Sequence, residues 1–364
     1  MTAGLATALT GALRLRPGVA VPHGIWSSRP DLVARLASGQ RAHDWPSRVG
    51  SLFNLCGHAQ RLCATLAVRA AAPGVLPPPT GVAERLRTET AQEHVRRIGL
   101  DWPRLLGGGD SDRLATQAAS DVGACPILKA DAGDGAWAPM SDWLQAVLGL
   151  PPERWLEAWH ADGADWLSAW TRQQMGWLPG LLGQARAWDV PGTVDPATAL
   201  RVPDNVAELD AGVAAHTGSW SRVGRRPFSA PMTPWALLGS RIAELITLSV
   251  GHNQATLAWG AHATGAGQGL AWVEMARGLL LHWVAVDEAT GRLLACRLLP
   301  PTDANFHPEG QVARHLAALD AQAPEADLAR HVRLLVAAFD PCVPFEIAQA
   351  QLPGHKNPAE AAHA

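Results

Sequence analysis

Two cysteine-containing segments near opposite ends of the chain carry the residue types best suited to binding a metal. Cys56 stands in the segment LCGH, which ends at His58, and Cys342 stands in the segment DPC. Thiolates bind soft and borderline metal ions, and a neutral imidazole can add a nitrogen ligand. Neither segment has the C-x-x-C spacing of a zinc or iron–sulfur site, so a metal site requires the two segments to meet in the fold. The structural alternative is that both cysteines are small buried hydrophobic residues.

The other cysteines and the N-terminus indicate the compartment. The chain has five cysteines, an odd and sparse set that excludes a disulfide scaffold and favours a reducing environment. Arg14 and Arg16 follow the apolar N-terminal residues instead of preceding them, unlike a secretory signal, so we expect a cytoplasmic protein. Cys63 lies about two helical turns beyond Cys56 in an expected helix. It is therefore a further candidate ligand, with burial in the core as the alternative.

Composition excludes several classes of protein. The chain has 364 residues, of which 48% are hydrophobic and 17% charged, with a formal net charge of −3. This composition excludes intrinsic disorder for most of the chain, and the balance of 30 basic and 33 acidic residues argues against nucleic-acid binding. The apolar stretch 278–286 is interrupted by His282 and falls short of the ~20 residues that a membrane span needs. We therefore expect no membrane insertion.

The elements that must position these residues are mostly helical. Long segments with few helix breakers predict helices at 52–72, 92–98, 235–250 and 331–339. Residues 272–286 and 293–299 flank the turn sequence DEATG and predict a β-hairpin that Pro300-Pro301 ends. The predicted fold is mainly α with a small antiparallel β element (α+β). We expect a single domain over 1–364, with a frayed tail at about 352–364.

A tryptophan-rich region lies in the middle of the chain. Tryptophans recur there at helical spacing, at Trp155, Trp159, Trp166, Trp170 and Trp177. This spacing puts them near one stripe of a helix, although Gly163 interrupts it and two packed helices fit the pattern as well as one does. Core packing is the favoured interpretation, and lining a cofactor is the alternative.

The segments 269–282 and 300–308 resemble the large subunit of nickel–iron hydrogenases, whose pattern is V-E-A-P-R-G, a hairpin, and P-[ST]-x-W-N-x-x-P. The residues that match in type and order are Val273, Glu274, Arg277, Gly278, His282, Pro301, Thr302, Asn305 and Pro308. Ala276 replaces the family's Pro before the Arg, and Ala304 replaces its Trp before the Asn. The resemblance implies a hydrogenase-large-subunit-like fold.

The two cysteine segments resemble the family's terminal motifs with one cysteine of each pair lost. DPC at Cys342 begins the motif D-P-C-x-x-C-x-x-H, whose second Cys falls on Phe345. In R-x-C-G-x-C-x-x-x-H, Cys56 aligns with the second Cys, which places the His at Gln60, or with the first, which leaves Ala59 at the second. This pattern of losses resembles the HupK/HoxV-type hydrogenase accessory proteins, which are degenerate relatives of the large subunit.

The resemblance implies a non-enzymatic scaffold. Two cysteines cannot build the family's four-thiolate nickel site, so no nickel is expected, but they can hold its Fe(CN)2(CO) unit transiently. Cys56 would take a bridging position and Cys342 a terminal nickel position, so a small rearrangement, or participation by His58 or Cys63, would be needed. By resemblance, Arg277 and the Pro301–Thr302 pair form the cradle, in which Arg277 and Thr302 donate hydrogen bonds to the cyanides. Their structural alternatives are an ion pair of Arg277 with Glu274 or Asp287, and a turn hydroxyl for Thr302.

The implied partners are hydrogenase maturation proteins, namely the small chaperone and the iron-loading protein of the Hyp system, and the large subunit precursor that receives the iron unit. Two other functions stay open. One is a metal-free mimic of the large subunit that docks maturation partners, for which both cysteines would be dispensable. The other is a mononuclear-iron redox enzyme.

Overall fold

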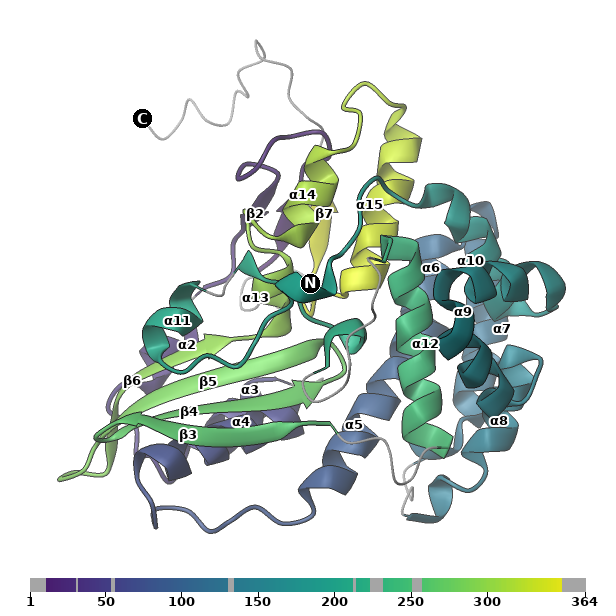
Figure 1. Cartoon of the computed structure of the whole chain (residues 1–364). Coiled ribbons are helices and arrows are strands. Elements are labelled where there is room, and N and C mark those ends of the chain that lie inside the picture. Colours follow the sequence, from purple (N-terminus) through teal and green to yellow (C-terminus); the bar gives the residue numbers. More distant parts are fainter. Residues whose placement is uncertain are drawn as a thin grey trace, which may run out of the picture.

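A four-stranded antiparallel sheet forms one side of the protein (Figure 1). The computed structural model describes residues 11–30, 32–53, 56–129, 134–211, 214–222, 232–250 and 257–348. The strand order is β3-β4-β5-β6, with bounds of Trp259–Gly265, Gln268–Met275, Gly278–Asp287 and Arg292–Leu299. The predicted hairpin between 272–286 and 293–299 is confirmed in its second half, because β5 and β6 pair antiparallel across the turn.

The prediction of one strand over 272–286 is wrong, because the chain reverses in the middle of that range. Met275 pairs with Gly278, so Ala276 and Arg277 form the tip of a hairpin between β4 and β5. Gly278 has φ 129°, a conformation that favours glycine, and a Cβ there would lie 2.4 Å from Thr217 Oγ1. The reversal places the Arg277 side chain at the end of the sheet instead of in its middle.

Helix α4 (Gly57–Ala71) lies against the sheet, and α3 (Trp45–Leu52) packs on α4 (Figure 1). Gly269 of β4 permits close packing, because a Cβ at that position would lie 2.2 Å from the Ala67 carbonyl oxygen of α4. The predicted helix 52–72 is therefore largely confirmed, although α4 begins at Gly57 and residues 54–55 lie outside the described residues.

The remaining long helices gather beside the end of the sheet (Figure 1). Their bounds are α5 Val82–Arg96, α6 Trp102–Leu106, α7 Ser111–Ala124, α8 Met140–Leu148, α9 Pro152–Gln173, α10 Trp177–Ala185, α12 Pro234–Val250 and α15 Glu325–Phe339. The predicted helix 235–250 is confirmed as α12. The predicted helix 92–98 is wrong at both ends, because α5 begins at Val82 and a turn of π-helix at Arg97–Asp101 joins it to α6. The predicted helix 331–339 begins earlier, at Glu325.

Short elements connect these layers and join the two ends of the chain. Strands β1 (Leu13–Leu15), β2 (Ile25–Ser27) and β7 (Phe345–Ile347) form a sheet of order β2-β1-β7 in which β1 and β7 are parallel. The short helices are α2 Leu32–Ala37, α11 Val206–Ala211, α13 Pro301–Asn305 and α14 Gln311–Ala317. Turns of 3-10 helix occur at Gly108–Asp110, Pro126–Leu128, Asp134–Ala136, Arg186–Trp188, Pro196–Thr198 and Ser219–Ser221.

The tryptophan stripe lies in the core, as the packing interpretation predicts. Trp155, Trp159 and Trp170 are fully buried. Trp155 stacks on Trp159 with ring centroids 5.7 Å apart and meets Trp170 edge to face. Gly163 adopts φ 51° and kinks α9, so the stripe runs over two helical halves.

The predicted fold class, mainly helical with a small antiparallel β element, is confirmed. Among the described residues, no helix is both long enough and apolar enough to cross a bilayer. The tail at 352–364 lies outside the described residues.

Candidate functional site

Cys56 caps the N-terminus of α4 and is buried, with 7% of its surface exposed. The first turn of the helix is capped by Glu89 of α5, whose carboxylate accepts hydrogen bonds from the backbone N–H groups of His58 (2.9 Å) and Ala59 (3.0 Å). These donors are therefore not available to stabilise a thiolate at Cys56. Burial raises the pKa of the Cys56 thiol to about 12. At neutral pH this cysteine is a thiol that must release a proton to bind a metal.

Cys342 follows the end of α15 and is held by Thr302. The Thr302 hydroxyl donates to Cys342 Sγ at 3.1 Å and accepts a hydrogen bond from the Cys342 backbone N–H at 3.1 Å. Pro301 is the first residue of α13, where its fixed φ and missing N–H suit a helix start, and it presents Thr302 in the first turn. The resemblance implies that the Thr302 hydroxyl donates a hydrogen bond to a cyanide. In this structure it donates that hydrogen bond to the sulfur of Cys342.

Arg277 interacts electrostatically with both cysteines. Although burial dominates the pKa of Cys56, Arg277 lowers that pKa and the charge of Cys342 raises it, so all three groups lie within electrostatic reach of one another. Asp340 and Glu93, together with both cysteines, outweigh burial and raise the pKa of Arg277 above its ordinary value. Arg277 is a permanent cation beside two potential thiolates.

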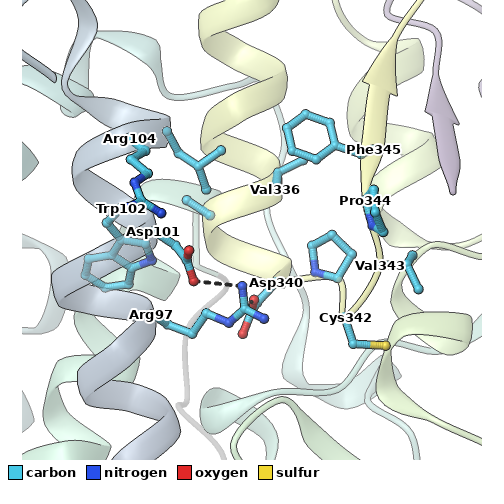
Figure 2. Close-up of a pocket in the computed structure, with 13 residues that line it drawn as sticks. Arg97, Asp101, Trp102, Arg104, Val336, Asp340, Cys342, Val343, Pro344 and Phe345 are labelled. Atoms are coloured by element: carbon cyan, nitrogen blue, oxygen red, sulfur yellow. Dashed lines mark hydrogen bonds and ion pairs between the residues drawn. The ribbon is translucent and has the colours of Figure 1, made fainter. Parts of the chain in front are cut away.

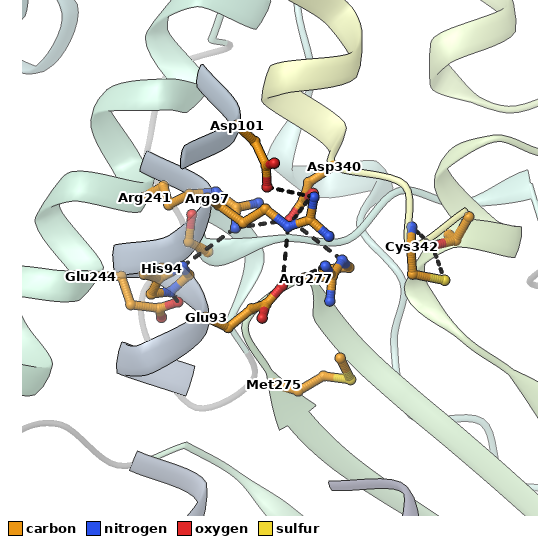
Figure 3. A network of polar contacts seen from close by, with 12 residues as sticks. Glu93, His94, Arg97, Asp101, Arg241, Glu244, Met275, Arg277, Asp340 and Cys342 are labelled. Carbon is orange, nitrogen blue, oxygen red and sulfur yellow. Dashed lines mark hydrogen bonds and ion pairs between the residues drawn. The ribbon is translucent and has the colours of Figure 1, made fainter. Parts of the chain in front are cut away.

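Arg277 is 2% exposed and is only partly satisfied (Figure 3). Its Nη2 donates to Glu93 Oε1 at 2.5 Å, and its Nε lies 3.4 Å from Asp340 Oδ2. Its Nη1 has no hydrogen-bond partner among the described residues. The ion pairs that the structure shows for Arg277 are thus with Glu93 and Asp340, while Glu274 accepts from the Ala258 N–H and Asp287 caps the β5–β6 turn.

Asp340, the first residue of the DPC segment, is the centre of a buried ion network (Figure 3). Arg97 Nε lies 3.1 Å from Asp340 Oδ1, and Arg241 Nη1 lies 3.1 Å from Oδ2. Although burial favours the neutral carboxyl, Arg277, Arg97 and Arg241 hold the pKa of Asp340 below its usual value. Asp340 is therefore ionised and ties α15 to α12, to the π-helical turn and to the tip of the β4–β5 hairpin.

The network continues into α12 through a histidine. His94 Nδ1 accepts from Arg241 Nη1 at 3.3 Å, and His94 Nε2 donates to Glu244 Oε2 at 2.8 Å, which fits the neutral imidazole. Burial lowers the pKa of His94. Glu244 also accepts from Arg222 Nε at 2.7 Å. These contacts make a continuous polar layer behind Arg277.

An open groove of about 380 Å³ leads to Cys342 from outside (Figure 2). Arg97, Asp101 and Arg104 line one side of it, and the segment from Asp340 to Phe345 lines the other. Arg97 Nη1 donates to Asp101 Oδ2 at 2.8 Å across this wall. Cys342 is half-buried at the groove, whereas Cys56 is buried, so the two sulfurs differ in access.

The structure does not bring the assisting candidates to this site. The Cys63 thiol points into the core, where it donates to the carbonyl oxygens of Ala271 at 3.5 Å and Leu280 at 3.7 Å. The half-buried His58 has a pKa lowered by burial, with Arg85 and Arg61 as its charged neighbours. Within the described ranges, no three His, Cys, Asp or Glu side chains are placed to hold one metal ion.

Two other residues that match the hydrogenase pattern hold the frame together. Asn305 accepts from the Thr217 N–H at 2.8 Å and donates to the Thr217 carbonyl at 2.9 Å. His282 donates through Nε2 to Gln60 at 2.9 Å, and burial lowers its pKa to about 3. The sequence reasoning missed Glu93 and Arg97; their i,i+4 spacing on one helix was the available signal, but it is equally typical of a surface pair.

The fold and site define a class of protein. No protein-family model matches the chain. Among solved structures, the fold matches a [NiFeSe] hydrogenase variant from Desulfovibrio vulgaris Hildenborough with a TM-score of 0.53, covering 90% of this chain and 93% of the other at 12% identity. It also matches an NAD+-reducing [NiFe]-hydrogenase with a TM-score of 0.51, covering 87% and 91% at 14% identity. The chain therefore has the fold of a [NiFe] hydrogenase large subunit.

Sequence relatives narrow the class. The chain is 40% identical to the hydrogenase expression/formation protein HoxV of Cupriavidus necator, over 95% of this chain and 97% of the relative. It is 32% identical to the hydrogenase expression/formation protein HupK of Bradyrhizobium diazoefficiens, over 88% and 90%. The chain belongs to the HoxV/HupK family of hydrogenase expression/formation proteins.

Proposed function

We propose that the chain is a non-catalytic hydrogenase maturation protein that holds an Fe(CN)2(CO) unit between Cys56 and Cys342. It passes the unit to the large subunit precursor. The names of its relatives support the accessory role. The observation that carries the finer proposal is that two cysteines, from opposite ends of the chain, lie within electrostatic reach of a buried Arg277 whose Nη1 has no hydrogen-bond partner among the described residues. A buried N–H group of a guanidinium without a partner favours a hydrogen-bond acceptor beside it.

The chemistry of loading is ligand exchange. Two thiols lose their protons and form two Fe–S bonds, while the bonds from iron to the donor's thiolates break and those thiolates take up the protons. The diatomic ligands stay on iron, and no electron is transferred. A two-thiolate site without nickel holds the unit less firmly than the finished enzyme does, which suits onward transfer. The donors on this proposal are the Hyp-type small chaperone and iron-loading protein.

Infrared spectroscopy of protein purified anaerobically from its native host tests the proposal. Cyanide and carbonyl stretching bands are expected in the wild type and should be lost in Cys56→Ala and Cys342→Ala. Cys63→Ala is the matched control, because it removes a buried thiol from the same helix α4 without touching the site, and it should keep the bands. A wild-type protein without bands and without iron would contradict the scaffold and favour a metal-free docking protein.

A further inference from the structure

The two edges of the four-stranded sheet differ in how the fold covers them. Strand β6 forms one edge, where the Gly39 N–H donates to the Leu293 carbonyl at 2.9 Å and the Leu293 N–H donates to the Gln40 carbonyl at 2.9 Å. Strand β3 is the outermost strand on the other side (Figure 1), and within the described part of the chain β4 is the one strand that pairs with it. The outer side of β3 is therefore available to a further strand.

Alternation along the β3–β4 pair shows which backbone groups of β3 face outward. The Glu274 N–H donates to the Ala258 carbonyl at 2.8 Å, so every second residue from Ala258 onward directs its N–H and C=O groups at β4. The residues between them direct these groups away from β4. Up to the register irregularity that follows Ala263, they are Trp259, Ala261 and Ala263. In the described ranges, no backbone hydrogen bond satisfies these outward groups.

Strand β3 also lacks the features that usually keep edge strands from pairing, which are charged side chains, prolines and bulges. Its sequence WGAHATG has no Asp, Glu, Lys, Arg or Pro, and its irregularity comes only after Ala263. At its first residue the edge borders an open groove of about 690 Å³, lined by Trp259, Leu66 and the Pro78–Pro79 pair among others. An incoming strand therefore meets no fixed charge on β3 and finds open space at this end.

We propose that β3 pairs antiparallel with β3 of a second copy of this chain, with Ala261 opposite its own counterpart on a two-fold axis. This register pairs all three outward residues, since Trp259 then faces Ala263 of the second copy and each such pair exchanges both backbone hydrogen bonds. It also sets large side chains against small ones, because His262 faces Gly260 on the other face of the strand. The two four-stranded sheets then form one continuous sheet.

The chemistry of the strand favours a second copy over a different protein as the partner. A two-fold axis brings each residue close to its own counterpart, so a charged strand would set like charges against each other. An uncharged strand in which the large residues alternate with small ones avoids this repulsion and fits itself. The pairing uses neither cysteine segment and does not involve Arg277, so it stands independently of the proposed function.

Cysteine cross-linking of the full chain tests the register. In Ala261→Cys the two new thiols meet at the two-fold axis with Cα atoms about 5.5 Å apart, which a disulfide can bridge. Ala263→Cys is the matched control on the same edge, because its two thiols are about 13 Å apart along the strands and cannot be bridged. Mild oxidation with diamide should link Ala261→Cys into a covalent dimer. The wild type and Ala263→Cys, which carry the same native cysteines, should stay unlinked.

Light scattering measures the mass of the particle in solution. The wild type should have twice the mass of the chain, and Ala261→Lys should have the mass of one chain, because two ammonium groups would meet at the axis. Leu294→Lys is the control on the covered edge strand β6, where Leu294 is 62% exposed, and should stay dimeric. If Ala261→Lys does not fold, the cross-linking result decides. A monomeric wild type would overturn the proposal and leave the edge to a strand of another protein, and equal cross-linking in both cysteine variants would also overturn it.

Discussion

Helix α12 separates two interiors of opposite chemistry. On one side, Gly239 lies so close to Trp159 that a Cβ would meet its ring at 2.5 Å, and this side is the tryptophan cluster Trp155, Trp159 and Trp170. On the other side, Arg241 and Glu244 enter the ion network around Asp340. One helix thus packs against rings on one face and buries charges on the other.

The two interiors contribute differently to the molecule. Burial of large rings is strongly stabilising, while a buried ion network roughly offsets its own desolvation and is often no better than an apolar core. Stability alone therefore does not account for several arginines buried together. The positioning of the site accounts for them, because the network fixes Asp340, Arg277 and the hairpin tip relative to the cysteines. The tryptophan side provides stability, and the charged side provides a defined geometry.

The largest effect is expected on the tryptophan side. Trp155→Ala removes a fully buried ring that packs on two others, and the cavity should lower the free energy of unfolding by about 3–5 kcal/mol. Urea denaturation measures this change. The control is Trp26→Ala, whose ring is 53% exposed and lies under the Arg14 guanidinium at 5.6 Å, so its loss should cost about 1 kcal/mol or less. Equal losses in the two variants would contradict the assignment of stability to the tryptophan cluster.

A somewhat smaller effect is expected from breaking the charged side. Glu244→Gln leaves Arg222 buried without its counter-charge and should cost about 3 kcal/mol in the same denaturation experiment. Asp327→Asn is the control, because its pair with Arg330 at 2.7 Å is about half exposed and is worth about 1 kcal/mol or less. A Glu244→Gln variant as stable as Asp327→Asn would show that the network relaxes without its charges. That result would contradict the role of the network as a rigid frame.

The two sides also differ in how far the sequence predicts them. Helix α12 follows from a long segment with few helix breakers, and the tryptophan stripe follows from spacing alone. The hairpin tip at Arg277 could not be predicted in this way. Apolar residues flank it on both sides, and the reversal lacks an Asn-Gly or Asp-Gly pair. Glu93 and Arg97 read as a surface pair, since only the fold covers them with α15 and the hairpin. Only the resemblance predicted that Cys56 and Cys342 share one site, because no local pattern links two such distant segments.

The smallest effect is the dependence of the free energy of unfolding on pH. It compares the paired carboxylates with a buried histidine that has no counter-ion. Arginines hold the pKa of Asp340 and that of Glu244 below the usual carboxyl range, so both stay ionised under mildly acidic conditions. Their contribution is lost only as the pH falls through those lowered values. His282 is the opposite case, because burial alone lowers its pKa from 6.5 to about 3 and no neighbouring charge contributes.

The sign for His282 follows from its protonation in the two states. Between pH 6.5 and 3 the unfolded chain binds a proton at this residue that the folded chain does not, so folding becomes less favourable as the pH falls. The loss approaches about 1.4 kcal/mol per pH unit. His94, His216 and His315 also have lowered pKa values, so the wild-type slope alone cannot be assigned to one residue.

The difference between wild type and His282→Gln isolates this residue. Lowering the pH from 7.5 to 5.5 should destabilise the wild type by about 1.4 kcal/mol more than the variant, measured by urea denaturation at each pH. Identical slopes would show that the imidazole is protonated in the folded state or reached by water. Glu244→Gln should leave the slope in this range unchanged, because a carboxylate with a lowered pKa does not titrate there. A changed slope in that variant would show that the charged network, and not the histidines alone, responds to mild acid.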